Sequence, residues 1–460
     1  MKKTLVMFLL VACGAPAMAL QLLSLDSCRA MAIRNNKQMG ITQQKKVMAH
    51  YTTKAARTQY LPKLNVVGGY MFTSREISLL SKEQKTTLSN IGTALSGSIG
   101  EDISSVIAAM TRDGVFTPSQ AEHIGAVLGN MGANVGGAIS AANKMASISE
   151  QMVANDYEAK LQATLHGTDH AYWMVVSLKH KRKLADNYLE LVKKLSNDVH
   201  KMIDEGVATR ADGLKVDVKV NEAEMTLTQA DNGLSLAKMF LCQLCGLPLD
   251  SKITLADEDR ESLPIEVVAD DIDINTVADN RPEVKLLENT VDLSRQATRL
   301  ARASYLPQIL LSGGYSATNP NLYNGFERKF SGAWNVGVVV RMPVWNWFEG
   351  VYKVRASKAA TCIAQLEVGD VREKIELQVS QSRFKMSEAN RRLVMATSNV
   401  DKANENLRCA NLGFREGVIP STGVMEAQTA WLQAQSQKID AEIDVKLSQV
   451  DYKKALGTLQ

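Results

Sequence analysis

The sequence predicts a mainly α-helical protein with a smaller membrane-spanning β-portion, built from two copies of one strand and long-helix element. At an offset of 245 residues, Ala56–Pro62 followed by Gly68–Tyr70 recurs as Ala301–Pro307 followed by Gly313–Tyr315. A second echo, at an offset of 211 residues, repeats Glu205-Gly206-Val207 as Glu416-Gly417-Val418. Periods this long indicate a duplicated, domain-sized element. Only 5% of the 460 residues are aromatic, which favours long helices over a compact enzyme core.

The first residues predict export from the cytoplasm. Lys2-Lys3 form a basic region, Leu5–Ala12 an apolar region, and Ala17-Met18-Ala19 a small-residue cleavage site, so we expect cleavage after Ala19. An alternative stays open, because Leu10–Cys13 resembles a lipobox in which Cys13 would be acylated. Both readings place the mature chain outside the cytoplasm.

Charge and hydropathy narrow the class of protein. The 53 basic and 49 acidic residues are interspersed and give a net charge of +4, so no basic patch points to nucleic acid. After the leader, the sequence contains no run of 18 apolar residues that would predict a transmembrane helix. A membrane would therefore have to be crossed by strands. The expected segments are a signal peptide at 1–19, repeat 1 at 20–246, a linker at 247–274 and repeat 2 at 275–460.

Each repeat begins with a predicted helix, at 26–59 or 275–304, that ends at Tyr-Leu-Pro because proline cannot continue it. Alternating strands follow at 64–73 in repeat 1, and at 308–316 and 334–342 in repeat 2. Their length of about ten residues suits a tilted membrane strand. Four aromatic residues near the strand ends are typical of a membrane interface: Trp334, Trp345, Trp347 and Phe348. A soluble hairpin is the alternative.

Very long helices are predicted next, at about 143–204 and 208–245 in repeat 1 and at 351–413 and 423–456 in repeat 2. The longest would extend roughly 90 Å. Helices of this length need coiled-coil seams with neighbouring helices or with other copies of the chain.

The insertion at 76–141 is the main irregularity of repeat 1. It is rich in Gly, Ala and Ser, and we expect amphipathic helices at 101–110 and 119–128. No segment resembles the returning strand of repeat 2, since Gly and Ala are depleted in strands. Either 125–141 pairs despite its composition, or the membrane sheet lacks a strand.

Two smaller features lie at the end of repeat 1 and in the linker that follows it. Cys242 and Cys245 form a single C-x-x-C near a helix end, without the second ligand pair of a zinc site, and are interpreted as packing residues. The linker at 247–274 predicts one short strand and a solvated acidic surface.

The chain resembles the TolC-like outer-membrane efflux proteins. The resemblance is carried by both Tyr-Leu-Pro segments, by Leu25–Ala32 before Asn35-Asn36, by Val336–Val344, and by Gly417–Ala434. It implies a homotrimer in which a twelve-stranded outer-membrane β-barrel continues into a periplasmic α-helical tunnel. It also implies contacts with outer-membrane lipid and docking to a periplasmic adaptor and an inner-membrane pump.

In such proteins the tip of repeat 2 holds a Tyr and an Arg that latch the closed tunnel, and two acidic residues at its constriction. The resemblance places these four at Phe414, Ile419, Gly423 and Glu426, so the usual latch cannot form. Asp212, the repeat 1 equivalent of Gly423, is a candidate for the missing acidic ring. The alternative interpretation of Glu426 is an ordinary exposed helix residue. Six turn residues are expected to contact the adaptor: Glu205, Gly206, Val207, Glu416, Gly417 and Val418.

The predicted function is a passive channel component of a tripartite efflux or type I secretion system. The alternative is a non-conducting scaffold that spans the envelope with an incomplete barrel. An enzyme is not expected, because the sequence has neither a phosphate-binding glycine loop nor a nucleophile elbow. His166 and His170 share a helix face but lack the intervening Glu of a zinc protease. No catalytic residue, cofactor or metal ligand is therefore predicted.

Overall fold

The computed structural model describes residues 21–72, 83–84, 86–87, 90, 123–135, 137–260, 274–319, 321 and 329–459. The chain divides into two compact units. The first comprises residues 1–48, 151–290 and 364–460, and the second comprises residues 49–150 and 291–363. The predicted signal peptide, Cys13 and the predicted helix at 101–110 lie outside the described residues.

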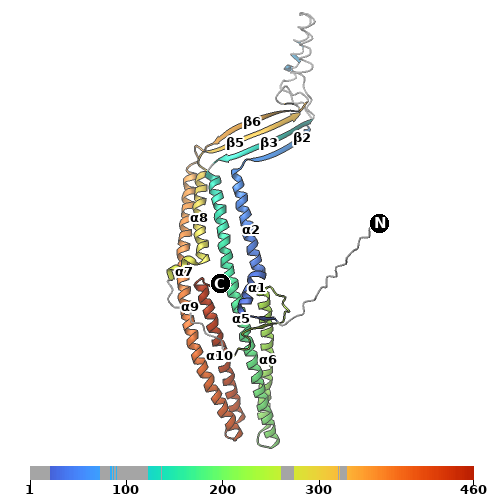
Figure 1. Ribbon diagram of the computed structural model, residues 1–460, viewed down its shortest axis with the longest axis vertical. Coiled ribbons are helices and arrows are strands. Elements are labelled where there is room, and N and C mark those ends of the chain that lie inside the picture. Colours follow the sequence, from blue (N-terminus) through green and yellow to red (C-terminus); the bar gives the residue numbers. More distant parts are fainter. Residues whose placement is uncertain are drawn as a thin grey trace, which may run out of the picture. The chain divides into compact units, whose positions relative to one another are not determined.

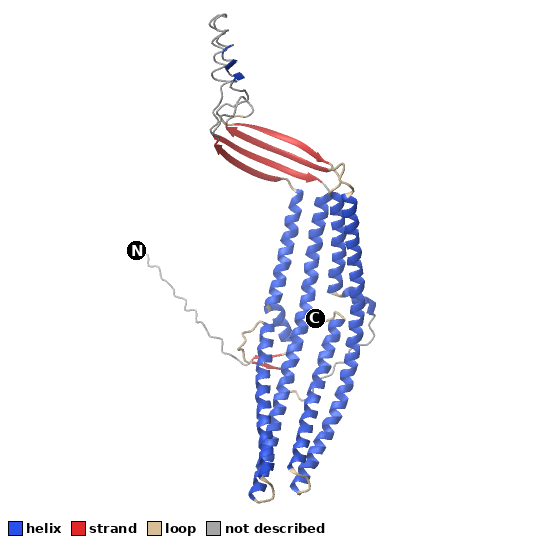
Figure 2. Cartoon of the chain, turned by 180° about the vertical axis from the view of Figure 1, so that it is seen from behind, coloured by secondary structure: helices blue, strands red, loops and turns tan. Residues whose placement is uncertain are grey.

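Four long helices form two hairpins (Figures 1 and 2). Helices α5 (Gly137–Asp204) and α6 (Arg210–Cys245) belong to repeat 1, and α9 (Glu349–Arg415) and α10 (Ser421–Ala455) belong to repeat 2. All four were predicted, although α5 begins six residues before the expected residue 143. Among the described helices, none has a stretch long and apolar enough to cross a membrane.

The helix at the start of each repeat is interrupted once, so the two single helices predicted there were wrong. Helix α1 (Leu25–Asn35) is separated from α2 (Lys37–Arg57) by Asn36, whose backbone is extended. Helix α7 (Ile274–Asn280) is separated from α8 (Pro282–Ala303) by Arg281. A proline at the first position of α8 suits a helix start, because its missing N–H has no partner there anyway.

The largest hydrophobic cluster of the first unit joins α1, α5, α6 and α10. Tyr172 and Val176 of α5 are fully buried, as are Leu241 of α6 and the three thiols of Cys28, Cys242 and Cys245. All three cysteines are free, so the interpretation of Cys242 and Cys245 as packing residues is confirmed. Burial first, and then the neighbouring Cys245 thiol, raise the pKa of Cys242.

The linker forms a short strand, as predicted, but part of its charge is buried. Strand β4 (Ile253–Leu255) pairs in parallel with β1 (Gln21–Leu23). Glu258 is only 1% exposed and accepts hydrogen bonds from Lys238 Nζ at 2.7 Å and from the Leu255 backbone N–H at 2.7 Å. The expectation of a wholly solvated acidic surface was therefore wrong for Glu258, because a buried carboxylate is retained where it is paired.

The second unit contains a four-stranded antiparallel sheet (Figure 2). Its strands, in spatial order, are β2 (Lys63–Phe72), β3 (His123–Val135), β5 (Gln308–Asn319) and β6 (Ser331–Arg341). Strand β3 pairs with β2 on one side and with β5 on the other.

Strand β3 is the returning strand of repeat 1, so the first of the two alternatives, pairing within 125–141, holds and the lack of a strand does not. The expected helix at 119–128 was wrong from His123 onward. Pairing does reach into 125–141, but it stops at Val135, and residues 137–141 begin α5. Strand propensity depends on context, and two flanking partners satisfy the backbone of β3 along most of its length.

Candidate functional site

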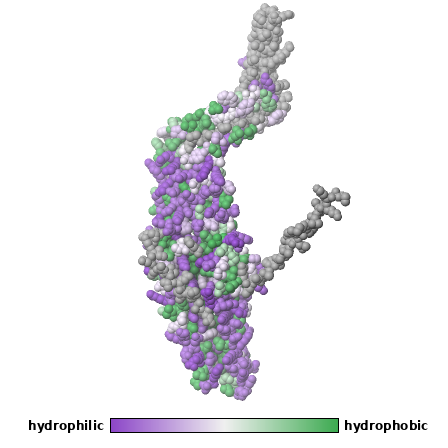
Figure 3. Space-filling view, viewed as in Figure 1, coloured by the Kyte–Doolittle hydropathy of each residue, from purple (hydrophilic) through white to green (hydrophobic). Residues whose placement is uncertain are grey.

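One face of the sheet is apolar and exposed. The register of β5 and β6 pairs Ile309 with Val340, Leu311 with Val338 and Tyr315 with Trp334. These six side chains are between 45% and 78% exposed. Figure 3 shows hydrophobic residues gathered over the sheet. An apolar patch of this kind in a single chain marks a surface for a partner or for lipid.

The same face continues onto β2. Leu64 and Gly313 are both paired with Met131 of β3, so Leu64 lies on the face that carries Leu311 and Tyr315. The other large apolar residues at this spacing in β2 are 64–71% exposed: Val66, Tyr70 and Phe72. The opposite face is richer in polar and small residues: Asn65, Gly69, Ser312, Gly314, Ser316, Asn335 and Gly337, with Val67, Leu310 and Val339 as exceptions.

Aromatic residues lie near both ends of β6. Trp345 packs edge-on against Trp347 and Phe348, with ring centroids 5.8 and 5.6 Å apart, in the segment between β6 and α9. The three side chains are 59–80% exposed. Trp345 and Phe348 border a pocket of about 580 Å³ that is also lined by Tyr305. Trp334 lies near the other end of the strand, so this placement matches the strand-end positions predicted from the sequence.

The two hairpin tips have the same turn. Gly206 and Gly417 both have left-handed backbones, with φ of +76° and +73°. The following residue donates its backbone N–H across the turn in each case, from Val207 to Met202 O and from Val418 to Gly413 O, both at 2.8 Å. Glycine is favoured at both positions because other residues adopt this conformation at a cost. The neighbouring turn residues, Glu205, Val207, Glu416 and Val418, are exposed.

The repeat 2 tip is held by apolar packing. A Cβ atom on Gly423 would lie 2.7 Å from Ile419 Cγ2, and a Cβ atom on Gly413 would lie 2.7 Å from Ile419 Cδ1. Ile419 therefore fills the space that two glycines leave open. Phe414 is partly buried and packs against a cluster that includes Val424 and Val216. The positions that resemble the Tyr and the Arg of the latch and one acidic residue of the constriction, Phe414, Ile419 and Gly423, thus form a tip held by packing.

The repeat 1 tip has a polar cap in addition to the packing of Ile203 beside Gly213. The Thr209 side chain accepts the backbone N–H of Asp212, and the Asp212 carboxylate accepts from the Thr209 N–H at 3.3 Å and from its hydroxyl at 2.6 Å. The hydrogen bond from the Thr209 hydroxyl is the main cause that lowers the pKa of Asp212. Sequence reasoning singled out Asp212 but missed Thr209, although Thr-x-x-Asp before a helix is a capping signature.

Glu426 lies on α10 one turn after Gly423 and is exposed. Its position is compatible with either expectation, a lining carboxylate or a plain surface residue. The Asp212 carboxylate has more polar partners, because it accepts hydrogen bonds from Thr209 and also lies 3.5 Å from Lys215 Nζ.

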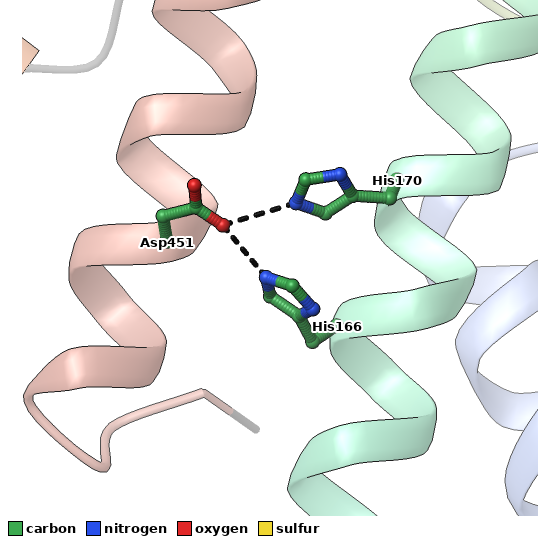
Figure 4. A group of neighbouring side chains, drawn as sticks. All are labelled: His166, His170 and Asp451. Carbon is green, nitrogen blue, oxygen red and sulfur yellow. Dashed lines mark hydrogen bonds and ion pairs between the residues drawn. The ribbon is translucent and has the colours of Figure 1, made fainter. Parts of the chain in front are cut away.

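Three side chains distant in sequence converge between α5 and α10 (Figure 4). His166 Nε2 and His170 Nε2 lie 2.7 and 3.0 Å from the same oxygen of Asp451. Burial raises the pKa of Asp451, but its hydrogen bonds to both histidines outweigh burial and leave that pKa below its ordinary value. The four-residue spacing revealed the histidine pair, whereas nothing in the sequence pointed to Asp451.

Comparison with known proteins identifies part of the chain. Residues 274–458 match the family model of the outer membrane efflux proteins. No curated protein matches this chain.

Solved structures share the fold at low identity. The Campylobacter jejuni CmeC outer membrane channel has a TM-score of 0.76 and 14% identity, over 94% of this chain and 85% of that one. The Vibrio cholerae outer membrane protein VceC has a TM-score of 0.73 and 14% identity, over 94% and 96%. The outer-membrane channel OprN has a TM-score of 0.74 and 15% identity, over 94% and 90%.

The predicted resemblance is therefore confirmed: residues 274–458 carry an outer membrane efflux protein domain, and the chain has the fold of these channels. The match to a family of efflux proteins also agrees with the prediction that the chain is not an enzyme.

Proposed function

From an outer membrane efflux protein domain and a channel fold, we propose that this protein is the passive outer-membrane channel of a tripartite efflux or type I secretion system. In this proposal three copies form a β-barrel in the outer membrane and a helical tunnel in the periplasm. A periplasmic adaptor and an inner-membrane pump supply the cargo and the driving force. The apolar, exposed face of the sheet is the observation that carries the proposal.

The sheet is suited to closure by other copies. Among the described strands, β2 and β6 are the edges of the sheet, and lipid-exposed backbone groups must be paired. Because the sheet has four alternating strands, β6 of one copy can join β2 of the next in antiparallel fashion. Three copies of four strands give a barrel of twelve, with the apolar face outward.

Strand length and aromatic placement support the same proposal. Strands β2, β5 and β6 contain 10, 12 and 11 residues, close to the roughly 9–11 residues of a tilted membrane strand. Trp334 near one end, and Trp345, Trp347 and Phe348 beyond the other, would lie at the two membrane interfaces, where aromatic girdles occur.

Helix α9 supplies a surface for neighbouring copies. Five large apolar side chains along this helix are 57–74% exposed: Ile363, Leu366, Leu377, Phe384 and Val394. Exposed apolar side chains along so long a helix favour packing against a partner that the isolated chain lacks. In the proposed trimer, these side chains pack against an adjacent protomer.

The tips complete the proposal. The exposed turns at Glu205–Val207 and Glu416–Val418 would be the contacts for the adaptor, with Val207 and Val418 71% and 79% exposed. The tunnel would be held closed by packing around Ile419, since the polar latch of the family has no counterpart there. Glu426 would line the constriction and favour cations.

A matched pair of variants on β6 tests the membrane assignment. Val338→Arg places a charge on the apolar face, whereas Asn335→Arg places the same charge on the opposite face of the same strand. A lipid-facing Arg costs about 2–4 kcal/mol near the bilayer midplane. We expect Val338→Arg to abolish trimers in outer-membrane fractions and Asn335→Arg to retain them.

Single-particle imaging of the detergent-extracted wild-type protein is the direct test. A trimer with a closed cylinder of strands above a helical tube is expected. A monomer, an open sheet, or equal tolerance of both arginine variants would contradict the proposal. The scaffold with an incomplete barrel has lost its support, because β3 supplies the strand on which that alternative depended.

A further inference from the structure

The three side chains in Figure 4 come from both repeats. His166 and His170 are one helical turn apart on α5 of repeat 1, and both imidazoles point toward Asp451 on α10 of repeat 2. One nitrogen of each ring and one carboxylate oxygen all lie within 4.8 Å of one another. Both helices belong to the first unit at this level, so the arrangement is internal to one compact unit.

This set of atoms is that of a metal site. Imidazole nitrogens and a carboxylate oxygen are ligands of Zn²⁺, which binds them at about 2.0–2.2 Å with tetrahedral geometry. Histidines four residues apart on a helix lie on one face and can share one ion. Three protein ligands leave a fourth position for water, as in open zinc sites.

The surroundings admit an ion and water. His170 and Asp451 line a pocket of about 380 Å³ between α5, α9 and α10. One of the two cations in its lining is paired with acidic groups: Arg392 lies 2.9 Å from Glu388 and 3.1 Å from Asp444. The two remaining charged lining residues are Lys385 and Asp451 itself. The three carboxylates of the lining therefore outnumber its two cations.

We propose that His166, His170 and Asp451 bind one divalent transition-metal ion, Zn²⁺ being the ion that best fits this ligand set. The bound ion would join α5 to α10, and so repeat 1 to repeat 2, near the end of the long hairpins opposite their tips. The ion would restrain two helices that otherwise meet there through hydrogen bonds.

The test is zinc binding by the full-length mature protein, purified in detergent and stripped with a chelator. Competition against a chromophoric zinc indicator should give one ion per chain. Asp451→Ala and His170→Ala should each weaken binding by more than about tenfold, since even loss of an outer-shell partner typically costs 10–100-fold. His200→Ala is the matched control, because His200 Nε2 lies 3.5 Å from Asp217 Oδ2 on the same repeat without a second histidine. This control should bind zinc as the wild type does.

A second measurement guards against variants that fold poorly. Zinc should raise the unfolding temperature of the wild type and of His200→Ala, and should leave that of both ligand variants unchanged. Cobalt substitution should give the intense visible absorption of a tetrahedral ion in the wild type and in His200→Ala, and not in the two ligand variants. Wild-type protein that binds no zinc, or ligand variants that keep the wild-type stoichiometry and affinity, would overturn the proposal. None of these outcomes depends on whether the protein forms a channel.

Discussion

In both repeats, the break between the first two helices is joined to the end of the last helix at equivalent positions, but by different side chains. In repeat 1, Asn36 Nδ2 donates to Leu244 O at 3.0 Å, at the end of α6. In repeat 2, Arg281 occupies the place of Asn36, 245 residues later, and its Nη1 donates to Lys454 O and Ala455 O at 2.8 and 2.7 Å, at the end of α10. The carbonyls at the end of the last helix are thus capped in both repeats, by an amide group in repeat 1 and by a guanidinium group in repeat 2.

The tips show the same divergence. Thr209 caps α6 with its side chain, whereas the equivalent Pro420 makes no side-chain cap, and its helix start is packed by Ile419 instead. Both tips have apolar contact, since a Cβ atom on Gly213 would lie 2.8 Å from Ile203 Cδ1 in repeat 1. Of the two helix starts, that of α6 has a side-chain cap in addition and that of α10 has none. Equivalent positions should therefore respond differently to equivalent substitutions.

The largest difference is expected at the joints. Arg281 is 4% exposed and also pairs with Glu283 at 3.0 Å. Arg281→Ala removes the charged donor from both carbonyls, and Lys454 O keeps the Gly457 N–H at 2.9 Å. Hydrogen bonds to charged groups contribute about 1.5–3 kcal/mol, against about 1 kcal/mol for a neutral one. Arg281→Ala should therefore lower the free energy of unfolding by about 2–3 kcal/mol, and Asn36→Ala by about 1 kcal/mol.

Chemical denaturation followed by helical circular dichroism measures both joint variants. Equal losses of unfolding free energy for Arg281→Ala and Asn36→Ala would contradict the larger contribution expected of the charged cap. Amide exchange near the end of α10 should also quicken in Arg281→Ala alone.

The second difference concerns packing at the repeat 2 tip. Gly423→Ala brings a Cβ atom to within 2.7 Å of Ile419 Cγ2, a methyl on a stiff β-branched side chain. Overpacking costs about 1–3 kcal/mol, which exceeds the gain of up to about 1 kcal/mol in helix propensity. The control is Gly369→Ala on α9, where nothing lies within 4 Å and the change should stabilise the protein.

The double variant Gly423→Ala with Ile419→Ala sharpens this test. If Ile419 is the obstacle, the cost of Gly423→Ala should disappear when Ile419 is truncated. A cost that persists in the double variant would point to another cause than this contact. Thermal unfolding of the four proteins gives the coupling energy.

These residues also show how far sequence reasoning reached. The long helices and the tip turns follow from local signals, because uninterrupted helical composition and Glu-Gly-Val are read within a few residues. Strand β3 was missed because its many Gly and Ala residues are poor strand formers, and only its two neighbours stabilise it.

Side chains that meet across the chain were equally out of reach. Asp451 joins His170 from 281 residues away, and Arg281 reaches Ala455 from 174 residues away. No local pattern predicts such pairs. The duplication did, however, indicate where equivalent backbone positions would be found, and Gly206 and Gly417 share their left-handed backbone as the repeat implied.

A smaller effect is expected from the cap of the repeat 1 tip. Thr209→Ala removes the acceptor for the Asp212 N–H and should destabilise the start of α6 by about 1 kcal/mol, the usual cost of losing such a cap. Pro420→Ala at the equivalent position should change stability far less, because Pro420 contributes no side-chain hydrogen bond. Amide exchange in the first turns of α6 and α10 separates the two tips, and matching changes in both would contradict the contrast between them.

The smallest effect is a pH dependence confined to the repeat 1 tip. Hydrogen bonds from Thr209 lower the pKa of Asp212 in the folded protein. A carboxyl group with a lowered folded pKa stabilises the fold above its ordinary pKa of 3.8, and that contribution is lost as the pH falls through the lower, folded value. Acidification below about pH 4 should therefore loosen the first turn of α6 before that of α10, which has Gly423 in the same place. Asp212→Asn should remove the difference between the two tips in this pH range. Amide exchange measured across that range would contradict the assignment if both tips loosened together in the wild type.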